Sequence, residues 1–192
     1  MNKTLQYYKE HALEYSKKTI NTNMTQTYEM FEKYLQPHAH ILDLGCGSGR
    51  DTKHFINNYN VTALDPVKAF LNNIPKNVNK LNIDAIDIIK HEELFNSFDA
   101  IFACASLLHI HKDNLKEVFL GCYKILKDDG IMYVSFKYGD YVGMRDDRYY
   151  IDLTEESIME YIGDFHLVEK KITGDNLQRD NRWLNCILKK SM

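Results

Sequence analysis

The sequence predicts an α/β protein with a doubly wound, mostly parallel sheet of about seven strands, preceded by two N-terminal helices. Short apolar segments alternate with amphipathic segments from residue 40 onward, which is typical of a parallel sheet covered by helices on both faces. The first apolar segment leads directly into a glycine-rich turn. The 192 residues suit one domain over 1–192, with a helical lid at 1–36 and the sheet core at 37–192.

The two expected helices at the N-terminus rest on helical spacing. The first covers residues 4–18, where aromatic and apolar side chains recur on one face: Leu5, Tyr8, Ala12 and Tyr15. The second covers residues 25–35 and ends before Pro37, because proline interrupts a helix.

The sheet follows these helices. We expect its strands near residues 40–44, 60–64, 80–83, 98–104 and 131–136. Helices are expected between them near residues 50–58, 67–72, 92–95 and 114–126, the last ended by Gly130. A loop rich in tyrosine and charge extends to residue 152, and a capped helix begins at Thr154. Two more strands are expected near residues 165–171 and 183–188.

The composition excludes several classes of protein. Hydrophobic residues make up 44% and charged residues 27%, which argues against a disordered or fibrous chain. Lysine and arginine number 24 against 27 acidic residues and are interspersed with them, so no field for non-specific nucleic-acid binding is expected. We find neither an apolar N-terminal signal segment nor a membrane-spanning stretch, and we expect a cytoplasmic protein.

Cysteines and histidines form no recognisable metal-binding pattern. The four cysteines stand singly, without a C-x-x-C pair, and we expect reduced, mostly buried thiols. The closest histidine pairs, such as His109 and His111, are two residues apart, which suits one helix face poorly. We therefore expect no dedicated metal site.

The most informative motif is the turn after the first strand, which contains Gly45, Gly47 and Gly49. Glycine lets the backbone turn sharply and lets a ligand approach where a Cβ atom would clash. The G-x-G-x-G spacing differs from the G-x-G-x-x-G of pyrophosphate-binding turns, which disfavours a pyrophosphate cofactor. Asp43 precedes the turn and would suit a ligand that carries an ammonium group.

Two further carboxylates follow later strands. Asp65 ends the second strand about 20 residues after the turn, where an acidic side chain accepts hydrogen bonds from ribose hydroxyls. Asp84 follows the third strand and could accept a hydrogen bond from an adenine amino group, although Asp87 could fill that role instead. Together these residues predict a nucleoside ligand at the carboxyl edge of the sheet.

These motifs resemble the class I S-adenosylmethionine-dependent methyltransferases. Residues 43–49 resemble the first motif of that family, Asp65 its ribose-binding acid and Asp84-Ala85 its adenine-binding pair. Arg50-Asp51 after the turn is similar to small bacterial members grouped with tellurite-resistance-type methyltransferases. The resemblance implies a Rossmann-like sheet that binds S-adenosyl-L-methionine and releases S-adenosyl-L-homocysteine. The chain departs from the family at Asp128-Asp129-Gly130, where Pro-Gly-Gly is usual.

The resemblance and the predicted strand ends together assign candidate site residues. Those expected to bind the cofactor are Tyr8, Tyr15, Asp43, Gly45, Cys46, Gly47, Gly49, Arg50, Asp65, Pro66, Asp84, Ala85, Cys104, Ala105 and Ser106. Those expected beside the transferred methyl group are His109, Lys137 and Tyr138. Those expected to bind the substrate are Arg145, Arg148, Arg182 and Trp183.

Each of these assignments has a plainer structural alternative. His109 could equally be a packed loop residue, and the tyrosines of the first helix are most simply its packing face, with a lid over the cofactor as the alternative. The mixture of cations and aromatic residues after residue 137 suits a small acidic or aromatic substrate, but a solvated loop with balanced charge fits as well.

The leading functional hypothesis is methyl transfer to a small molecule by in-line displacement, because so short a chain has little room for a separate substrate domain. The alternatives are a methyltransferase acting on tRNA or protein, a nicotinamide-dependent oxidoreductase, and a binding module without catalysis. We expect a monomer or homodimer with a small-molecule partner and no membrane association.

Overall fold

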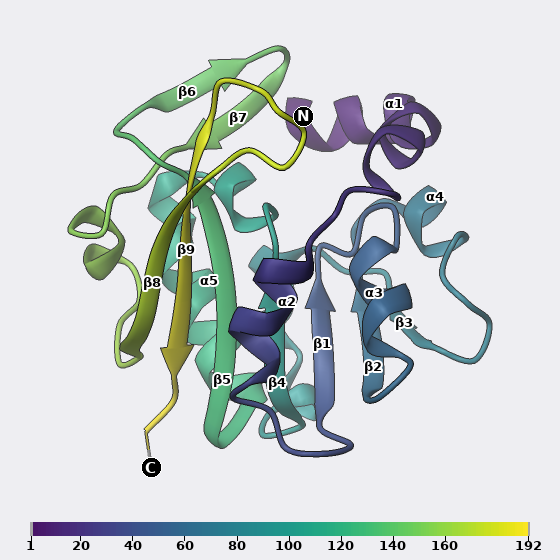
Figure 1. Ribbon diagram of the computed structural model, residues 1–192, viewed down its shortest axis with the longest axis vertical. Helices are drawn as coiled ribbons and strands as arrows, with labels where there is room; N and C mark the ends of the chain where they lie inside the picture. Colours follow the sequence, from purple (N-terminus) through teal and green to yellow (C-terminus); the bar gives the residue numbers. More distant parts are fainter. Residues whose placement is uncertain (1, 192) are drawn as a thin grey trace.

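The computed structural model describes residues 2–191 and contains a seven-stranded sheet in the order β3-β2-β1-β4-β5-β9-β8 (Figure 1). Its strands are β1 (His40–Leu44), β2 (Asn60–Leu64), β3 (Asn79–Leu81), β4 (Phe98–Ala103), β5 (Leu126–Lys137), β8 (His166–Gly174) and β9 (Arg182–Lys189). The strands from β3 to β5 pair in parallel, whereas β9 is antiparallel to both of its neighbours. The predicted doubly wound, mostly parallel sheet is therefore confirmed.

Helices and short helical turns connect the strands. The α-helices are α1 (Lys3–Thr19), α2 (Thr25–Glu32), α3 (Arg50–Phe55), α4 (Lys68–Leu71) and α5 (Lys112–Ile125). The 3₁₀ turns are η1 (Ala85–Lys90), η2 (Glu92–Leu94), η3 (Leu107–His109) and η4 (Ser157–Glu160). A separate hairpin pairs β6 (Val142–Arg145) with β7 (Arg148–Ile151).

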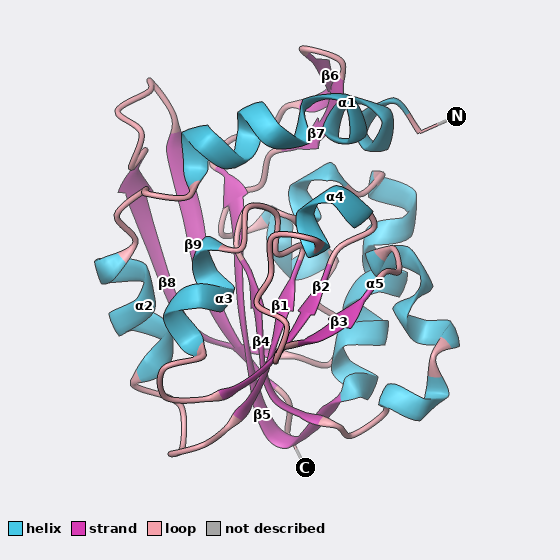
Figure 2. Ribbon diagram, turned by 90° about the vertical axis from the view of Figure 1, so that its right-hand side faces the viewer, coloured by secondary structure: helices cyan, strands magenta, loops and turns pink. Residues whose placement is uncertain are grey.

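The sheet lies between two helical layers, with α2 and α3 on one face and α5 on the other (Figure 2). Successive side chains of a strand point to opposite faces. Ile41 accordingly packs in the cluster that contains residues of α2 and α3, while its neighbour Leu42 packs in the cluster that contains residues of α5. This alternation gives the protein two apolar cores, one on each side of the sheet.

The two N-terminal helices have different positions. Helix α2 packs on the sheet, where the ring of Phe31 is fully buried and its centroid lies 5.6 Å from that of Phe55 and 5.1 Å from that of Phe102. Helix α1 instead lies over the carboxyl ends of the parallel strands, beside the β6–β7 hairpin (Figures 1 and 2). Within the range 1–36 that was predicted as a lid, α1 thus lies over the sheet edge, whereas α2 packs on a face of the sheet.

Helix α1 is anchored by its cap and by a small apolar contact. The Asn2 side chain accepts a hydrogen bond from the Leu5 backbone N–H at 3.2 Å, which caps the first turn. Ala12 is buried against Val67 and Phe70, with the predicted tyrosines of the same face packed around them. The aromatic face predicted for this helix is therefore turned toward the sheet edge.

One predicted helix is only a short turn, and Gly130 does not cap the helix predicted over residues 114–126. The helix expected from Thr154 is only the single turn η4, because Gly163 adopts a left-handed φ of +58° and the chain must enter β8 at His166. Helix α5 ends at Ile125, five residues before Gly130, and the left-handed residue there is Asp129, with a φ of +62°. Gly130 is required for another reason, since a Cβ atom on it would lie 2.7 Å from the Lys127 carbonyl oxygen.

The segment expected as a loop up to residue 152 contains the β6–β7 hairpin. Its turn is formed by Asp146 and Asp147, whose φ values of +46° and +60° match the type I′ turn that joins antiparallel strands. The turn lacks the Asn-Gly or Asp-Gly pair that normally marks such hairpins in a sequence. The predicted elements at residues 50–58 and 80–83 end earlier, at Phe55 and Leu81, and the one at 92–95 is the 3₁₀ turn η2.

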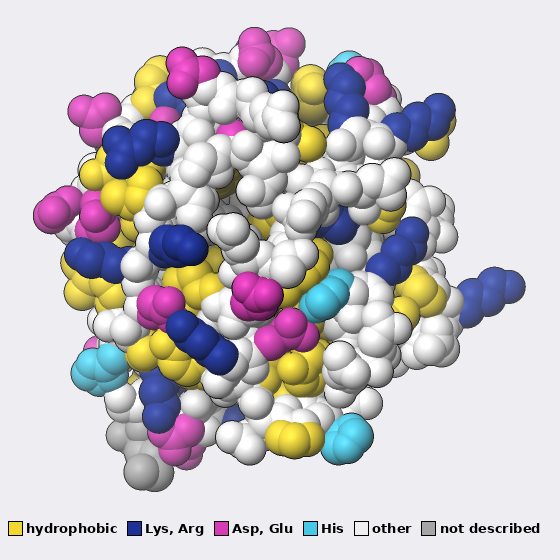
Figure 3. All heavy atoms as spheres, in the orientation of Figure 1, with side chains coloured by type: hydrophobic (Ala, Val, Ile, Leu, Met, Phe, Trp, Pro, Cys, Tyr) yellow, Lys and Arg dark blue, Asp and Glu magenta, His cyan; other side chains and the backbone are white. Residues whose placement is uncertain are grey.

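Lysine and arginine side chains are intermixed with acidic ones over the face shown in Figure 3. Within residues 2–191, no helix combines the length and the apolar character needed to cross a bilayer. All four cysteines are free, and Cys46, Cys122 and Cys186 are buried.

The packing of α2 predicts a large effect of Phe31→Ala on stability. We expect the free energy of unfolding to fall by about 3–5 kcal/mol, because the substitution opens a cavity between α2 and the sheet. Leu13→Ala in α1 is the control, since Leu13 is 69% exposed and its loss should change stability by less than about 0.5 kcal/mol. Denaturant unfolding measures both, and equal effects would place α2 outside the core.

Candidate functional site

The glycine-rich turn between β1 and α3 requires glycine because its backbone is left-handed and because it leaves no room for a Cβ atom at Gly45. Gly45, Gly47 and Gly49 have left-handed φ values of +77°, +49° and +78°. A Cβ atom on Gly45 would lie 2.4 Å from the Ser106 Cβ atom, which is closer than atoms can approach. The turn therefore packs directly against the loop that follows β4.

Asp65 joins this turn to the end of β2. Its carboxylate accepts hydrogen bonds from the backbone N–H groups of Gly47 at 3.0 Å and Val67 at 2.8 Å. The side chain is only 5% exposed, and burial raises the pKa of Asp65 to about 6. At neutral pH it is an ionised carboxylate that has lone pairs left for hydroxyl donors.

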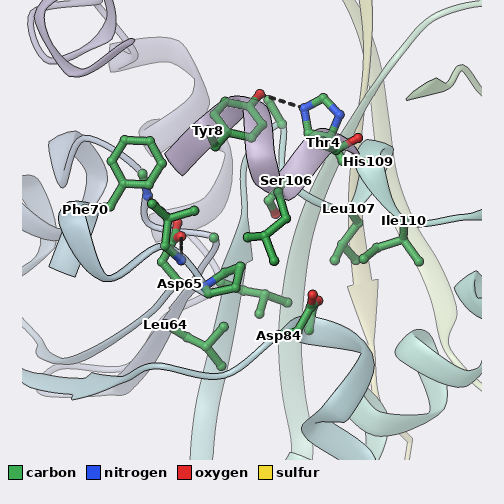
Figure 4. Close-up of a pocket in the computed structure, with 18 of the residues that line it drawn as sticks. Thr4, Tyr8, Leu64, Asp65, Phe70, Asp84, Ser106, Leu107, His109 and Ile110 are labelled. Carbon is green, nitrogen blue, oxygen red and sulfur yellow. Dashed lines mark hydrogen bonds between the residues drawn. The ribbon is translucent and has the colours of Figure 1, made fainter. Parts of the chain in front are cut away.

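A first cavity opens beside Asp65 at the carboxyl edge of the sheet (Figure 4). It measures about 790 Å³ with its mouth included. Its wall combines apolar residues such as Leu64, Phe70 and Ile110 with the carboxylates of Asp65 and Asp84. This combination suits a ligand with one flat apolar part and one part rich in hydroxyl groups.

Most of the residues predicted to bind the cofactor line this first cavity. They are Tyr8, Tyr15, Gly45, Gly47, Asp65, Pro66, Asp84, Ala85, Cys104, Ala105 and Ser106. His109, predicted beside the methyl group, lines it as well. Asp84 caps η1 by accepting a hydrogen bond from the Ile86 backbone N–H at 3.3 Å, which fixes the position of its carboxylate.

Four predicted cofactor ligands lie elsewhere. Asp43 is buried at the end of β1, accepts a hydrogen bond from the Thr52 hydroxyl, and is in the wall of neither main cavity. Burial and the charge of Asp51 raise the pKa of Asp43. Cys46 and Gly49 are also absent from the cavity walls, and Arg50 lines only the second cavity.

The second cavity lies next to the first, between α1, the β6–β7 hairpin and the ends of β5, β8 and β9. It measures about 1240 Å³ with its mouth included. Five residues belong to the walls of both cavities: Tyr8, Tyr15, Cys104, Ala105 and His109. The two cavities therefore meet at the loop after β4 and at the inner face of α1.

The residues predicted near the acceptor divide between this cavity and the outer surface. Those that line the second cavity are Lys137, Arg145, Arg148 and Trp183. Tyr138 and Arg182, which were predicted near the acceptor as well, do not line it. They line a shallower depression, in which the Arg182 guanidinium lies 4.6 Å from the centre of the Tyr138 ring.

A hydrogen-bonded pair lies where the two cavities meet. The Tyr8 hydroxyl is 2.8 Å from His109 Nε2 (Figure 4), and His109 Nδ1 is 2.7 Å from the Tyr149 carbonyl oxygen. A carbonyl oxygen only accepts, so Nδ1 carries the proton and Nε2 accepts from Tyr8. Burial lowers the pKa of His109 to about 4 and raises that of Tyr8, so both groups are uncharged at neutral pH.

Sequence reasoning missed several wall residues. Thr4 and Phe70 line the first cavity, and Thr4 also accepts a hydrogen bond from the Tyr149 backbone N–H at 2.8 Å. The position of Thr4, one helical turn before Tyr8, is a signal that could have identified it. Asp175 and Asn185 line the second cavity and depend on the pairing of β8 with β9, for which the sequence offers no local signal.

Comparison with known proteins agrees with this geometry. Residues 42–132 match the family model described as a methyltransferase domain. The match extends from β1 to the first half of β5 and so covers the parallel part of the sheet. It includes the glycine-rich turn and the three carboxylates Asp43, Asp65 and Asp84. Over residues 42–132 the chain is therefore similar to a methyltransferase domain, and its fold is the Rossmann-like fold of the class I S-adenosylmethionine-dependent methyltransferases.

Individual relatives of this methyltransferase domain are distant. A phosphoethanolamine N-methyltransferase of Plasmodium falciparum is 28% identical over 106 residues, which cover 53% of this chain and 40% of that protein. The 1,6-didemethyltoxoflavin-N1-methyltransferase of Burkholderia thailandensis has a TM-score of 0.76 at 21% identity, over 98% of this chain and 85% of that one. A Haemonchus contortus phosphoethanolamine N-methyltransferase has a TM-score of 0.70 at 15% identity, over 97% and 58%. The two solved structures share the fold.

The first cavity fits S-adenosylmethionine, the cofactor of such domains. Asp65 offers an ionised carboxylate to ribose hydroxyls, and the apolar wall suits an adenine ring. The Ser106 hydroxyl is buried in this wall without a hydrogen-bond partner, so a polar ligand atom would satisfy it. Within residues 2–191, no three His, Cys, Asp or Glu side chains gather in a way that could hold a metal ion.

The raised pKa of Asp65 predicts a pH dependence of cofactor binding. Protonation removes the negative charge that accepts from ribose hydroxyls, so the affinity for S-adenosylhomocysteine should decrease as the pH falls through about 6. Asp65→Asn should weaken binding by about 1.5–3 kcal/mol at pH 8 and remove this dependence. Calorimetry over pH 5–8 tests both, with the exposed Asp128→Asn as the control. An unchanged pH profile in Asp65→Asn would exclude this carboxylate from the site.

Proposed function

We propose that this protein transfers the methyl group of S-adenosylmethionine to a small-molecule acceptor. The junction of the two cavities is the observation that supports this function, because five residues belong to both walls. A donor in the first cavity and an acceptor in the second would meet at this junction, beside His109 and Tyr8. The cofactor supplies a carbon that is already activated for displacement, so the protein has mainly to align the two reactants.

The chain's own residues prepare this junction in three ways. The uncharged His109–Tyr8 pair avoids placing a positive charge beside a cationic sulfonium, which a protonated histidine would do. Helix α1 covers the carboxyl edge and limits the access of water. The Tyr149 carbonyl oxygen fixes the orientation of the His109 ring.

The shape of the second cavity favours a small acceptor over a macromolecule. Its walls come from α1, the hairpin, the loop after β4 and the ends of three strands, so it is a concave pocket formed by several elements. The relatives agree, since the bacterial structure contains 1,6-didemethyltoxoflavin and the nematode structure phosphomonomethylethanolamine. Both ligands are small molecules.

The proposed activity is tested with cofactor labelled in its methyl group and an extract of small metabolites. We expect label to enter the metabolite fraction, and neither treatment of the extract with ribonuclease nor treatment with protease should change the yield. Loss of transfer after one of these treatments would identify RNA or protein as the acceptor. Thermal stabilisation by NAD, without stabilisation by S-adenosylhomocysteine, would indicate an oxidoreductase instead.

Deletion of residues 1–18 tests whether α1 acts as a lid. We expect kcat/KM to fall at least about tenfold, because the deletion removes Tyr8 and Tyr15 from both cavities. The melting temperature should change by less than about 5 °C, since α1 contributes only the small Ala12 cluster and neither of the two large cores.

Hydrogen exchange provides the second measurement for the lid. The amides of α1 should exchange more slowly when S-adenosylhomocysteine is bound. A truncated protein with normal turnover would leave α1 as packing alone, as would exchange rates that are the same with and without the ligand.

A further inference from the structure

The second cavity has an uneven distribution of charge. Five cationic side chains line it, against two acidic ones: Arg50, Lys137, Arg145, Arg148 and Arg179 against Asp146 and Asp175. The chain as a whole has a net charge of −3. The excess of positive charge is therefore a local feature of this cavity.

Three of the five cations are neutralised by carboxylates. Arg50 Nε lies 2.8 Å from Asp51, and Arg145 forms two hydrogen bonds to Asp152, at 3.0 Å and 2.7 Å. Arg179 binds Asp175 in a similar way, at 3.0 Å and 2.8 Å. These pairs satisfy their own charges and leave little attraction for a ligand.

Lys137 and Arg148 have no such partner. Neither forms an ion pair with any residue in the part of the chain that the structure describes, and Arg148 Nε is buried without a hydrogen-bond partner. Both are half-buried, and burial together with the charge of Arg145 lowers the pKa of Lys137. Two unpaired cations in a half-buried wall are unfavourable unless an anion accompanies them.

Both cations lie near the Tyr150 ring, and the Arg148 guanidinium also lies 4.5 Å from the centre of the Tyr7 ring. Lys137 Nζ lies 4.7 Å from the centre of the Tyr150 ring, and the Arg148 guanidinium carbon lies 5.4 Å from it. The centre of the His109 ring is 4.7 Å from that of the same Tyr150 ring. Tyr150 thus connects the unpaired cations with the junction of the two cavities.

We propose that Lys137 and Arg148 bind an acidic group of the methyl acceptor, either a phosphate monoester or a carboxylate. This inference rests on the proposed function and specifies its substrate class. Because the Tyr150 ring lies near both the cations and His109, we expect the acidic group and the methylated atom to be close together in the acceptor. The acceptor is therefore a compact anion.

Anion binding is measured by nuclear magnetic resonance titration of the full chain saturated with S-adenosylhomocysteine. Inorganic phosphate and acetate are the probes, and chloride keeps the ionic strength constant. We expect at least one probe to bind, and Lys137→Gln and Arg148→Gln each to weaken it at least tenfold. Lys127→Gln is the control, since Lys127 lies at the opposite end of the same strand and pairs with Asp99.

The outcomes separate this inference from the proposed function. Failure of the wild-type protein to bind S-adenosylhomocysteine would overturn the proposed function. Binding of S-adenosylhomocysteine without binding of either anion would overturn the acidic subsite alone, as would anion binding that both glutamine variants retain. The probe that binds more tightly identifies the acidic group: phosphate indicates a phosphate monoester, and acetate indicates a carboxylate.

A second experiment examines the acceptor itself, using metabolite extract and cofactor labelled in its methyl group. We expect the labelled product to be retained on an anion-exchange resin. Its release by phosphatase would identify a phosphate monoester, and its retention a carboxylate. A labelled product that passes through the resin before any phosphatase treatment would overturn the proposal.

Discussion

The site depends on one buried carboxylate, because Asp65 holds together the two loops that form its floor. Strands β1 and β2 pair in parallel with Leu44 opposite Leu64, so the loops that follow them begin at the same level. The Leu64 carbonyl oxygen accepts hydrogen bonds from the N–H groups of Gly45 and Cys46, and Asp65 accepts from Gly47. The backbone of the turn is therefore fixed by β2, and the carboxylate that fixes it also faces the cavity.

A second set of contacts links three segments that are far apart in the sequence. Tyr8 of α1, His109 after β4 and the carbonyl group of Tyr149 in β7 form one chain of hydrogen bonds. Thr4 adds a separate bond between α1 and β7. Because these residues are near both cavities, an event that displaces α1 would open the donor side and the acceptor side together.

The sequence allowed the sheet to be predicted, and most residues predicted to bind the cofactor line one cavity, because both features depend on local signals. Gly47 and Asp65 occur at the ends of apolar strands, and parallel strands bring such ends to one edge. The acceptor wall was harder to predict, since neighbouring side chains at a strand end point in opposite directions. Lys137 enters the second cavity while the adjacent Tyr138 lies outside it. Only the pairing of β5 with β9 and the unexpected hairpin decide which of the two faces inward.

The charge of the acceptor wall could not be derived from composition, because neighbours in the sequence are not partners in space. Asp146 and Asp147 precede Arg148 directly, yet both form the hairpin turn and neither pairs with it. The unpaired side-chain cations and the sulfonium of the cofactor carry charge of the same sign, so these side chains weaken the binding of the cofactor. An acidic acceptor bound between them reverses this effect. Cofactor and acceptor should accordingly bind more tightly together than apart, with a coupling free energy that weakens as salt screens the charges.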